Sequence, residues 1–141
     1  MILRRATADD APGCAAIVDA WLDGLDWMAE RPDRTTLEGL LRDGLPRRDA
    51  WVAEDAGAVA GYVSCDAAEG HVHTLYVARP GAGTGRLLLD RVRRGRDRLT
   101  LNTHAPNHAA HRFYAREGFV AVQTDLPGAD GVPEIRMEWR R

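Results

Sequence analysis

Residues 75–89 read LYVARPGAGTGRLLL. A β-strand pattern ending at Val77 leads into a loop with three glycines, Gly81, Gly83 and Gly85, and then into a leucine-rich helix pattern. Glycines allow tight turns and a close approach of the main chain to a ligand, and a helix N-terminus presents free N–H donors. The stretch predicts either a phosphate cradle or a tight strand-to-helix turn in which the glycines serve geometry alone.

Two common phosphate-binding motifs do not fit this loop. A phosphate-loop NTPase needs a lysine, and all 19 basic residues of the chain are arginines. A dinucleotide-binding loop needs a third glycine where Arg86 stands. The absence of lysine also excludes a Schiff-base mechanism.

The segments on either side of the loop predict a mixed α/β sheet, because a block of hairpin strands is flanked by strand–helix–strand units. Apolar periodicity and turn residues place strands at 2–6, 49–53, 59–66, 71–77, 98–103, 120–124 and 134–139. They also place four helices. The first begins after a cap at 7–10 and ends at Gly24, and the second covers 37–42 with Thr35 or Thr36 as its cap. The others cover 84–96 and 107–117, the last of them ended by Gly118.

Composition limits the classes of protein. The 141 residues fit one domain, 1–141, and 45% hydrophobic with 28% charged residues is an ordinary globular balance. No apolar stretch could span a membrane and no signal core starts the chain, so a cytoplasmic protein is expected. Cys14 and Cys65 have no metal-site spacing and are expected to be buried. The net charge of −2 argues against a nucleic-acid partner. A basic run could still bind nucleic acid, and it comprises Arg91, Arg93, Arg94, Arg96 and Arg98. The favoured interpretation of this run is a solvated face, of which some residues lie near a bound phosphate.

A second motif follows at 107–119, NHAAHRFYAREGF. Together with the glycine loop it resembles the GCN5-related N-acetyltransferase (GNAT) superfamily, in which Asn107, Ala110, the Phe113-Tyr114 pair and the Gly118-Phe119 pair match a motif that follows the acetyl-CoA loop. The resemblance implies a mixed, mostly antiparallel central sheet of six to seven strands, with splayed middle strands and about four flanking helices. One departure lies in the loop, where Pro80 occupies the family's arginine or glutamine position and Arg79 lies one place early.

The resemblance implies an enzyme whose co-substrate is acetyl-CoA. The pantetheine arm would pair with the main chain of residues 75–77, the pyrophosphate would lie on residues 81–86, and the Val77 N–H would stabilise the oxyanion. Tyr114 would protonate the leaving thiolate, or only pack against the arm, and Asn107 would cap its helix or contact the ligand. The implied cofactor residues are Leu75, Tyr76, Val77, Arg79, Gly81, Ala82, Gly83, Thr84, Gly85, Arg86, Asn107 and Tyr114.

The base that deprotonates the amine is a separate question. His73 is the candidate, since a histidine titrates near neutrality and strict alternation would place it on the face of Leu75 and Val77. The alternative is that His73 has only a structural role. His104 is a second residue expected to line the gap between the splayed strands. No histidine has acidic neighbours at metal-ligand spacing, so no metal is predicted.

The acceptor is expected to be a small primary amine or an amino-acid-like molecule. In the family, the first two helices and their connection form the acceptor pocket, and here they supply Trp21, Asp26, Trp27 and Glu30. Core packing is the alternative for this segment, and the 125–133 loop would wall the other side. A protein N-terminus or lysine side chain, a non-catalytic acyl-CoA-binding module and a homodimer are further alternatives that the resemblance leaves open.

Overall fold

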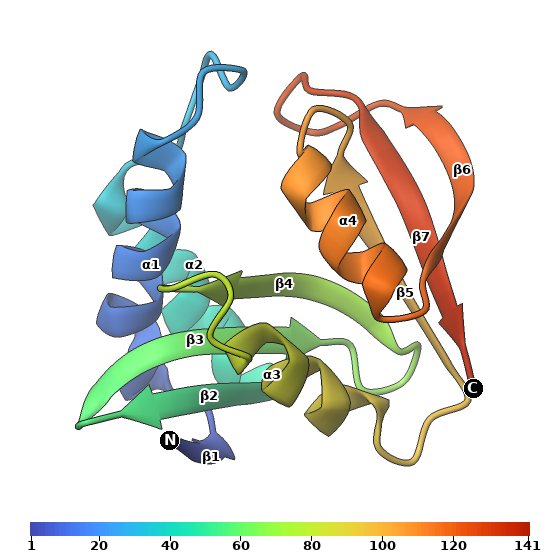
Figure 1. The fold of residues 1–141 in the computed structure, drawn as a ribbon. Coiled ribbons are helices and arrows are strands. Elements are labelled where there is room, and N and C mark those ends of the chain that lie inside the picture. The colour runs from blue at the N-terminus through green and yellow to red at the C-terminus, as the bar shows by residue number, and fades with distance from the viewer.

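The computed structural model describes all 141 residues as one seven-stranded sheet with helices on both faces (Figure 1). The strands are β1 (Ile2–Arg5), β2 (Asp49–Asp55), β3 (Ala58–Cys65), β4 (His71–Val77), β5 (Arg98–His104), β6 (Val120–Leu126) and β7 (Glu134–Arg140). The helices are α1 (Ala11–Asp23), α2 (Arg34–Gly44), α3 (Thr84–Arg93) and α4 (His108–Arg116). The predicted α/β class and element order are confirmed.

The sheet has the order β1-β2-β3-β4-β5-β7-β6, and every neighbouring pair is antiparallel except β4 and β5. That parallel pair holds only two register positions, His71 opposite Thr100 and Val72 opposite Leu101. Beyond them the two strands diverge, and Figure 1 shows α1 and α2 with the first half of the sheet and α4 with the second. The predicted splay of the middle strands is therefore present.

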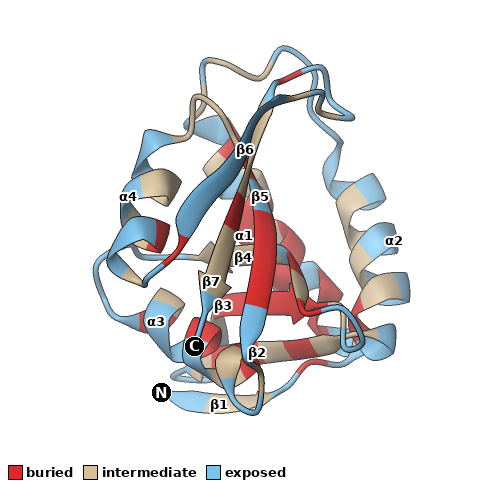
Figure 2. Ribbon diagram, turned by 90° about the vertical axis from the view of Figure 1, so that its right-hand side faces the viewer, coloured by how far each residue is buried: buried red, intermediate tan, exposed pale blue.

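Each face of the sheet buries its own apolar cluster. One cluster packs α3 and α4 against the sheet through residues such as Leu88, Leu89 and Tyr114. The other packs α1 and α2 through residues such as Val18 and Tyr62. Figure 2 shows the buried residues along the central strands and the exposed length of β6 at the edge. Both cysteines are fully buried, as expected.

Helix ends account for most boundary differences. Helix α2 begins at Arg34 because the Asp33 side chain, and not Thr35 or Thr36, accepts the capping hydrogen bond from the Thr36 N–H at 2.7 Å. Helix α3 ends at Arg93, three residues before the predicted end, because Gly95 adopts a left-handed φ of 77°. No helix has the length and apolar composition needed to cross a bilayer.

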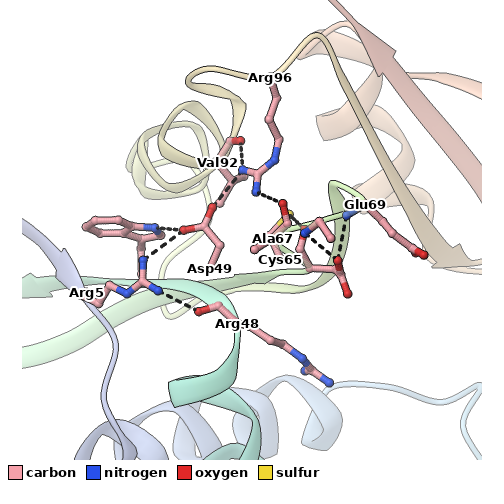
Figure 3. A network of polar contacts seen from close by, with 11 residues as sticks. Arg5, Arg48, Asp49, Cys65, Ala67, Glu69, Val92 and Arg96 are labelled. Atoms are coloured by element: carbon pink, nitrogen blue, oxygen red, sulfur yellow. Dashed lines mark hydrogen bonds and ion pairs between the residues drawn. The ribbon is translucent and has the colours of Figure 1, made fainter.

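A polar network anchors the far end of α3 to the sheet (Figure 3). The Asp49 carboxylate accepts hydrogen bonds from the Trp51 indole at 2.8 Å and the Arg96 guanidinium at 2.9 Å, and Arg96 also donates to the main-chain oxygens of Val92 and Ala67. Although burial alone would raise it, the pKa of Asp49 is lowered by the hydrogen bonds from Trp51 and Arg96.

The basic run 91–98 is therefore largely structural. The Arg91 guanidinium lies 3.8 Å from the centre of the Trp51 ring, and Arg93 pairs with Glu117 at 2.7 Å. The side chains of Arg93 and Arg96 are only 14% and 19% exposed. The prediction of a solvated face is wrong for these two residues, because their carboxylate partners come from remote segments.

Candidate functional site

The divergence of β4 and β5 opens a cleft of about 790 Å³. Its walls are β4, the glycine loop, the start of α3, the end of β5 and α4. The Ala78 N–H donates to the Ala60 oxygen across the β3–β4 ladder. Because bonding direction alternates along an antiparallel strand, the main-chain groups of Leu75 and Val77 face the opposite edge, into the gap. An extended ligand could pair with them there.

A β-bulge interrupts β4 beside this gap. The register runs from Ser64 opposite Thr74 to Cys65 opposite Val72, which leaves His73 as an extra residue. Val72 and Leu75 consequently pack into the same core cluster despite their odd spacing. The expectation that His73 shares a face with Leu75 and Val77 through strict alternation is therefore wrong.

His73 lies beside a second histidine at the floor of the cleft. The ring of His71 is 5.4 Å from that of His73, and its Nδ1 lies 2.8 Å from the Thr100 hydroxyl. Partial burial, with the nearby charge of Arg48, lowers the pKa of His73. Burial and the neighbouring His73 likewise lower the pKa of His71. Both rings are therefore neutral at neutral pH.

The glycine loop delivers the N-terminus of α3 to the cleft. Gly81 and Gly83 have left-handed φ values of 83° and 81°, and a side chain there would meet nothing within 4 Å. Helix α3 begins at Thr84, as predicted, and the first N–H groups of a helix lack intrahelical acceptors. Gly85 has a packing role, because a Cβ there would lie 3.1 Å from the ring of Phe113. The loop can thus hold an anion with main-chain donors.

Most residues of the predicted cofactor set line the cleft. They are Leu75, Tyr76, Val77, Arg79, Gly81, Gly83, Thr84, Gly85, Arg86, Asn107 and Tyr114, whereas Ala82 does not line it. Two arginines of α4, Arg112 and Arg116, also line it and were missed. Their spacing of four residues on a helix was the available signal, because such residues share one face. They add positive charge beside the loop.

Tyr114 lies under the cleft from the α4 side. Its side chain is buried at 8% exposure, with its ring centre 5.2 Å from that of Phe113 and 5.3 Å from that of Phe119. Burial raises the pKa of Tyr114, so the phenol holds its proton at neutral pH. Asn107 caps α4 by accepting from the Ala110 N–H at 3.2 Å.

Aromatic and acidic side chains close the other end of the cleft. The Trp21 ring lies 5.1 Å from that of Tyr76, and the Trp27 ring lies 5.1 Å from that of His104. The Nε2 atom of His104 lies 2.7 Å from the Asp130 carboxylate. The 125–133 loop, expected to wall the cleft, contacts the lining residue His104 through Asp130, but none of its own residues lines the cleft.

The four predicted acceptor residues do not all meet there. Trp21 lines the cleft, and Trp27 contacts it through His104. Asp26 and Glu30 are exposed and lie outside it. The carboxylates at this end are instead Asp130 and Glu134, far along the chain.

One histidine and two carboxylates come together at this end. A ring nitrogen of His104 and one carboxylate oxygen each of Asp130 and Glu134 all lie within 4.8 Å of one another. Sequence spacing did not reveal this group, since its members come from two strands and a loop. Burial alone would raise the pKa of Asp130, but the hydrogen bond with His104 lowers it. Two carboxylates beside the ring can stabilise a protonated imidazole.

The comparisons with known proteins agree with this geometry. A family model described as an acetyltransferase (GNAT) domain matches residues 34–141. The peptidyl-lysine N-acetyltransferase YjaB of Escherichia coli K12 is 28% identical over 120 residues, or 83% of this chain and 80% of that protein. The solution structure of apo YjaB matches with a TM-score of 0.75 at 26% identity, covering 99% of this chain and 98% of that one.

A further solved structure shares the fold. The yncA protein of Salmonella typhimurium, solved with its cofactor acetyl-CoA, matches with a TM-score of 0.72 at 22% identity, covering 99% of this chain and 93% of that one. Because the family model covers most of the sequence, the chain belongs to the GNAT family of acetyltransferases, whose co-substrate is acetyl-CoA.

Proposed function

We propose that the protein transfers the acetyl group of acetyl-CoA directly to the primary amine of a small-molecule or amino-acid-like acceptor. One observation carries the proposal: beyond Val72, β4 no longer pairs with β5. The main-chain groups of Leu75 and Val77 on that edge therefore face an open gap. Unpaired strand edges bind extended ligands by main-chain hydrogen bonds. The pantetheine arm has amides suited to such pairing.

The fit of the cofactor is supported by a polar atom that lacks a partner in the protein. The hydroxyl of Thr103 is buried, makes no hydrogen bond and belongs to a residue that lines the cleft, whereas the buried hydroxyl of Thr74 lies beside the Tyr62 phenol. The N–H groups around Gly83 would hold the pyrophosphate, and Arg79, Arg112 and Arg116 would add charge. Main-chain donors of the loop would thus take over much of the work of the family's loop arginine.

In the proposed mechanism the acceptor attacks the thioester while both substrates are bound. The Val77 N–H stabilises the oxyanion, and Tyr114 donates its proton to the leaving thiolate. The raised pKa of Tyr114 suits this role, because the phenol arrives protonated. The expected base, His73, lines the cleft, but the bulge turns it away from the face of Leu75 and Val77, so this role stays a prediction.

A lysine side chain of a protein is the second candidate acceptor. The observation in its favour is the name of the 28% identical relative, a peptidyl-lysine N-acetyltransferase. Both acceptors present the same primary alkylamine to the thioester. A panel of free amines, amino acids and lysine-containing peptides, assayed by thiol release from acetyl-CoA, separates the two.

The Tyr114→Phe variant tests the catalytic assignment. We expect kcat to fall by about 10²- to 10⁴-fold, the usual contribution of a positioned acid. Acetyl-CoA affinity, measured by calorimetry, should stay within about threefold. Tyr62→Phe is the matched control, because it removes the same hydroxyl from a tyrosine outside the cleft. Unchanged turnover in Tyr114→Phe would exclude the acid role, and acetyl-CoA binding without turnover on any amine would favour a non-catalytic binding module.

A further inference from the structure

The group at the aromatic end of the cleft has the organisation of a proton acceptor. His104 ends β5, and Asp130 reaches it from the loop between β6 and β7. A carboxylate can only accept, so the Asp130 contact of 2.7 Å assigns the proton of neutral His104 to Nε2. The lone pair then lies on Nδ1. A carboxylate placed in this way fixes the tautomer and stabilises the imidazolium once it forms.

The surroundings of His104 suit an alkylammonium ion. The Trp21 and Trp27 rings lie 6.3 and 5.1 Å from the His104 ring, and such faces attract the aliphatic part and charge of a cation. Glu134 adds a second negative charge, and Asn102 holds its carboxylate with a hydrogen bond of 3.1 Å. The positive charge of the acceptor is therefore met at the place where its proton must leave.

His73 lacks these supports. It lies at the bulge of β4, and the carboxylates of Asp66 and Glu69 act on it through charge alone, without a hydrogen bond to its ring. Its partial burial and the charge of Arg48 both oppose the protonated ring that a base must become. Asp66 and Glu69 act in the opposite direction, but more weakly.

We propose that His104, oriented by Asp130, removes the proton from a primary alkylammonium acceptor bound between the two tryptophans and Glu134. The inference rests on the proposed acetyl transfer and names its acceptor class and base. An N–H bond of the ammonium breaks, its electron pair becomes the nucleophile, and the proton moves to Nδ1 of His104. Asp130 stays ionised throughout and faces the imidazolium.

Other titratable groups also face His104. Glu134 approaches from β7, and His111 of α4 lies with its Nε2 3.1 Å from the His104 main-chain oxygen. Tyr76 on β4 is neutral in the working range, since burial and the charge of Asp130 raise its pKa to about 12. Among these groups, Asp130 alone hydrogen-bonds the His104 ring.

The decisive experiment compares two acceptors in the His104→Gln variant. One is an alkylamine that is protonated at the assay pH, and the other is an amine of similar size whose ammonium pKa lies below that pH. We expect kcat/KM to fall by about 10²- to 10⁴-fold for the first and by less than about tenfold for the second, which needs no deprotonation before it attacks. His108→Gln, an exposed change on α4, is the control.

Several outcomes would overturn the assignment. They are an equal loss for both amines, a loss below about threefold, or the same acceptor-selective loss in His73→Gln with His104→Gln active. A wild-type enzyme that binds acetyl-CoA but turns over no amine would refute the proposed function instead. In that case the NMR signal of the His104 ring, titrated with n-butylamine hydrochloride, still decides on the ammonium site. A shift that Glu134→Gln weakens supports the site, and no shift refutes it.

Discussion

Gly61→Ala should damage the cofactor end of the cleft although Gly61 itself does not line it, because the added Cβ would press on residues that do. Gly61 lies on β3 opposite Val77, under the start of α3. An added Cβ would lie 2.9 Å from the Tyr76 main-chain oxygen, 3.0 Å from Thr84 Cγ2 and 3.1 Å from Leu88 Cδ1. All three belong to the strand and helix that frame the pantetheine and pyrophosphate positions.

The size of the effect follows from these distances. Ordinary contact begins at 3.4 Å, so either β4 or α3 must move by about 0.5 Å. Overpacking of this kind costs about 1–3 kcal/mol in free energy of unfolding, or roughly 3–10 °C in Tm for a chain of this size. Because the shift separates strand from helix, we expect the Kd for acetyl-CoA to rise by about three- to tenfold, near 0.7–1.4 kcal/mol.

Thermal unfolding followed by circular dichroism, and calorimetry with acetyl-CoA, measure the two effects. Gly39→Ala is the matched control, since Gly39 is in α2 and its Cβ would meet nothing within 4 Å. That change should stabilise the helix by about 0.5–1 kcal/mol and leave binding unchanged. If Gly61→Ala melts within 1 °C of the wild type and binds acetyl-CoA equally well, the close packing of α3 on β3 does not set the cleft.

Two further predictions concern charge and burial. Asp49→Asn should destabilise the fold by about 1–3 kcal/mol, because the partly buried Arg96 loses its carboxylate, while Arg42→Gln on the surface should not. The folded-state pKa of Asp49 lies below its ordinary value of 3.8. The ionised carboxylate therefore contributes its full stabilisation of the fold above about pH 3.8, and this contribution disappears as the pH falls through the lowered pKa. Asp49→Asn should accordingly flatten the acid limb of a curve of unfolding free energy against pH. Burial raises the pKa of Cys14 to about 12 and that of Cys65 to about 11, so both thiols should react with a thiol reagent only at the rate of unfolding. Rapid labelling of the native protein, counted by absorbance, would contradict the packing around them.

Local sequence predicted the elements that contain strong local signals. Strand β4 has the predicted bounds of His71–Val77, α3 begins at the predicted Thr84, and α4 begins one residue after the predicted start, because glycine turns and the Asn107 cap act within a few residues. The cleft between β4 and β5 followed from the family resemblance. Its arginines on α4 were available in the sequence as a helical spacing.

The parts that sequence could not supply depend on remote partners or on register. The meeting of His104, Asp130 and Glu134 requires two strand pairings and a loop, none of which is encoded in spacing. The bulge at His73 is a property of the β3–β4 ladder, so strict alternation placed His73 on the wrong face. Arg96 was expected on a solvated face, because nothing in the local sequence indicates that Asp49 of β2 lies beside it.

The bulge in β4 has a consequence for how such an enzyme can change during evolution. One extra residue divides the seven-residue strand into two segments, 71–72 before the bulge and 74–77 after it. The alternation of side chains between the two faces of the sheet is reversed from one segment to the other. Substitutions before the bulge alter the part of the cleft where β4 still pairs with β5, while those after it alter the strand edge that faces the gap. A lineage can thus change residues 71–72 without shifting the strand edge at 74–77, whereas a one-residue deletion at position 73 would reverse the alternation of one segment relative to the other.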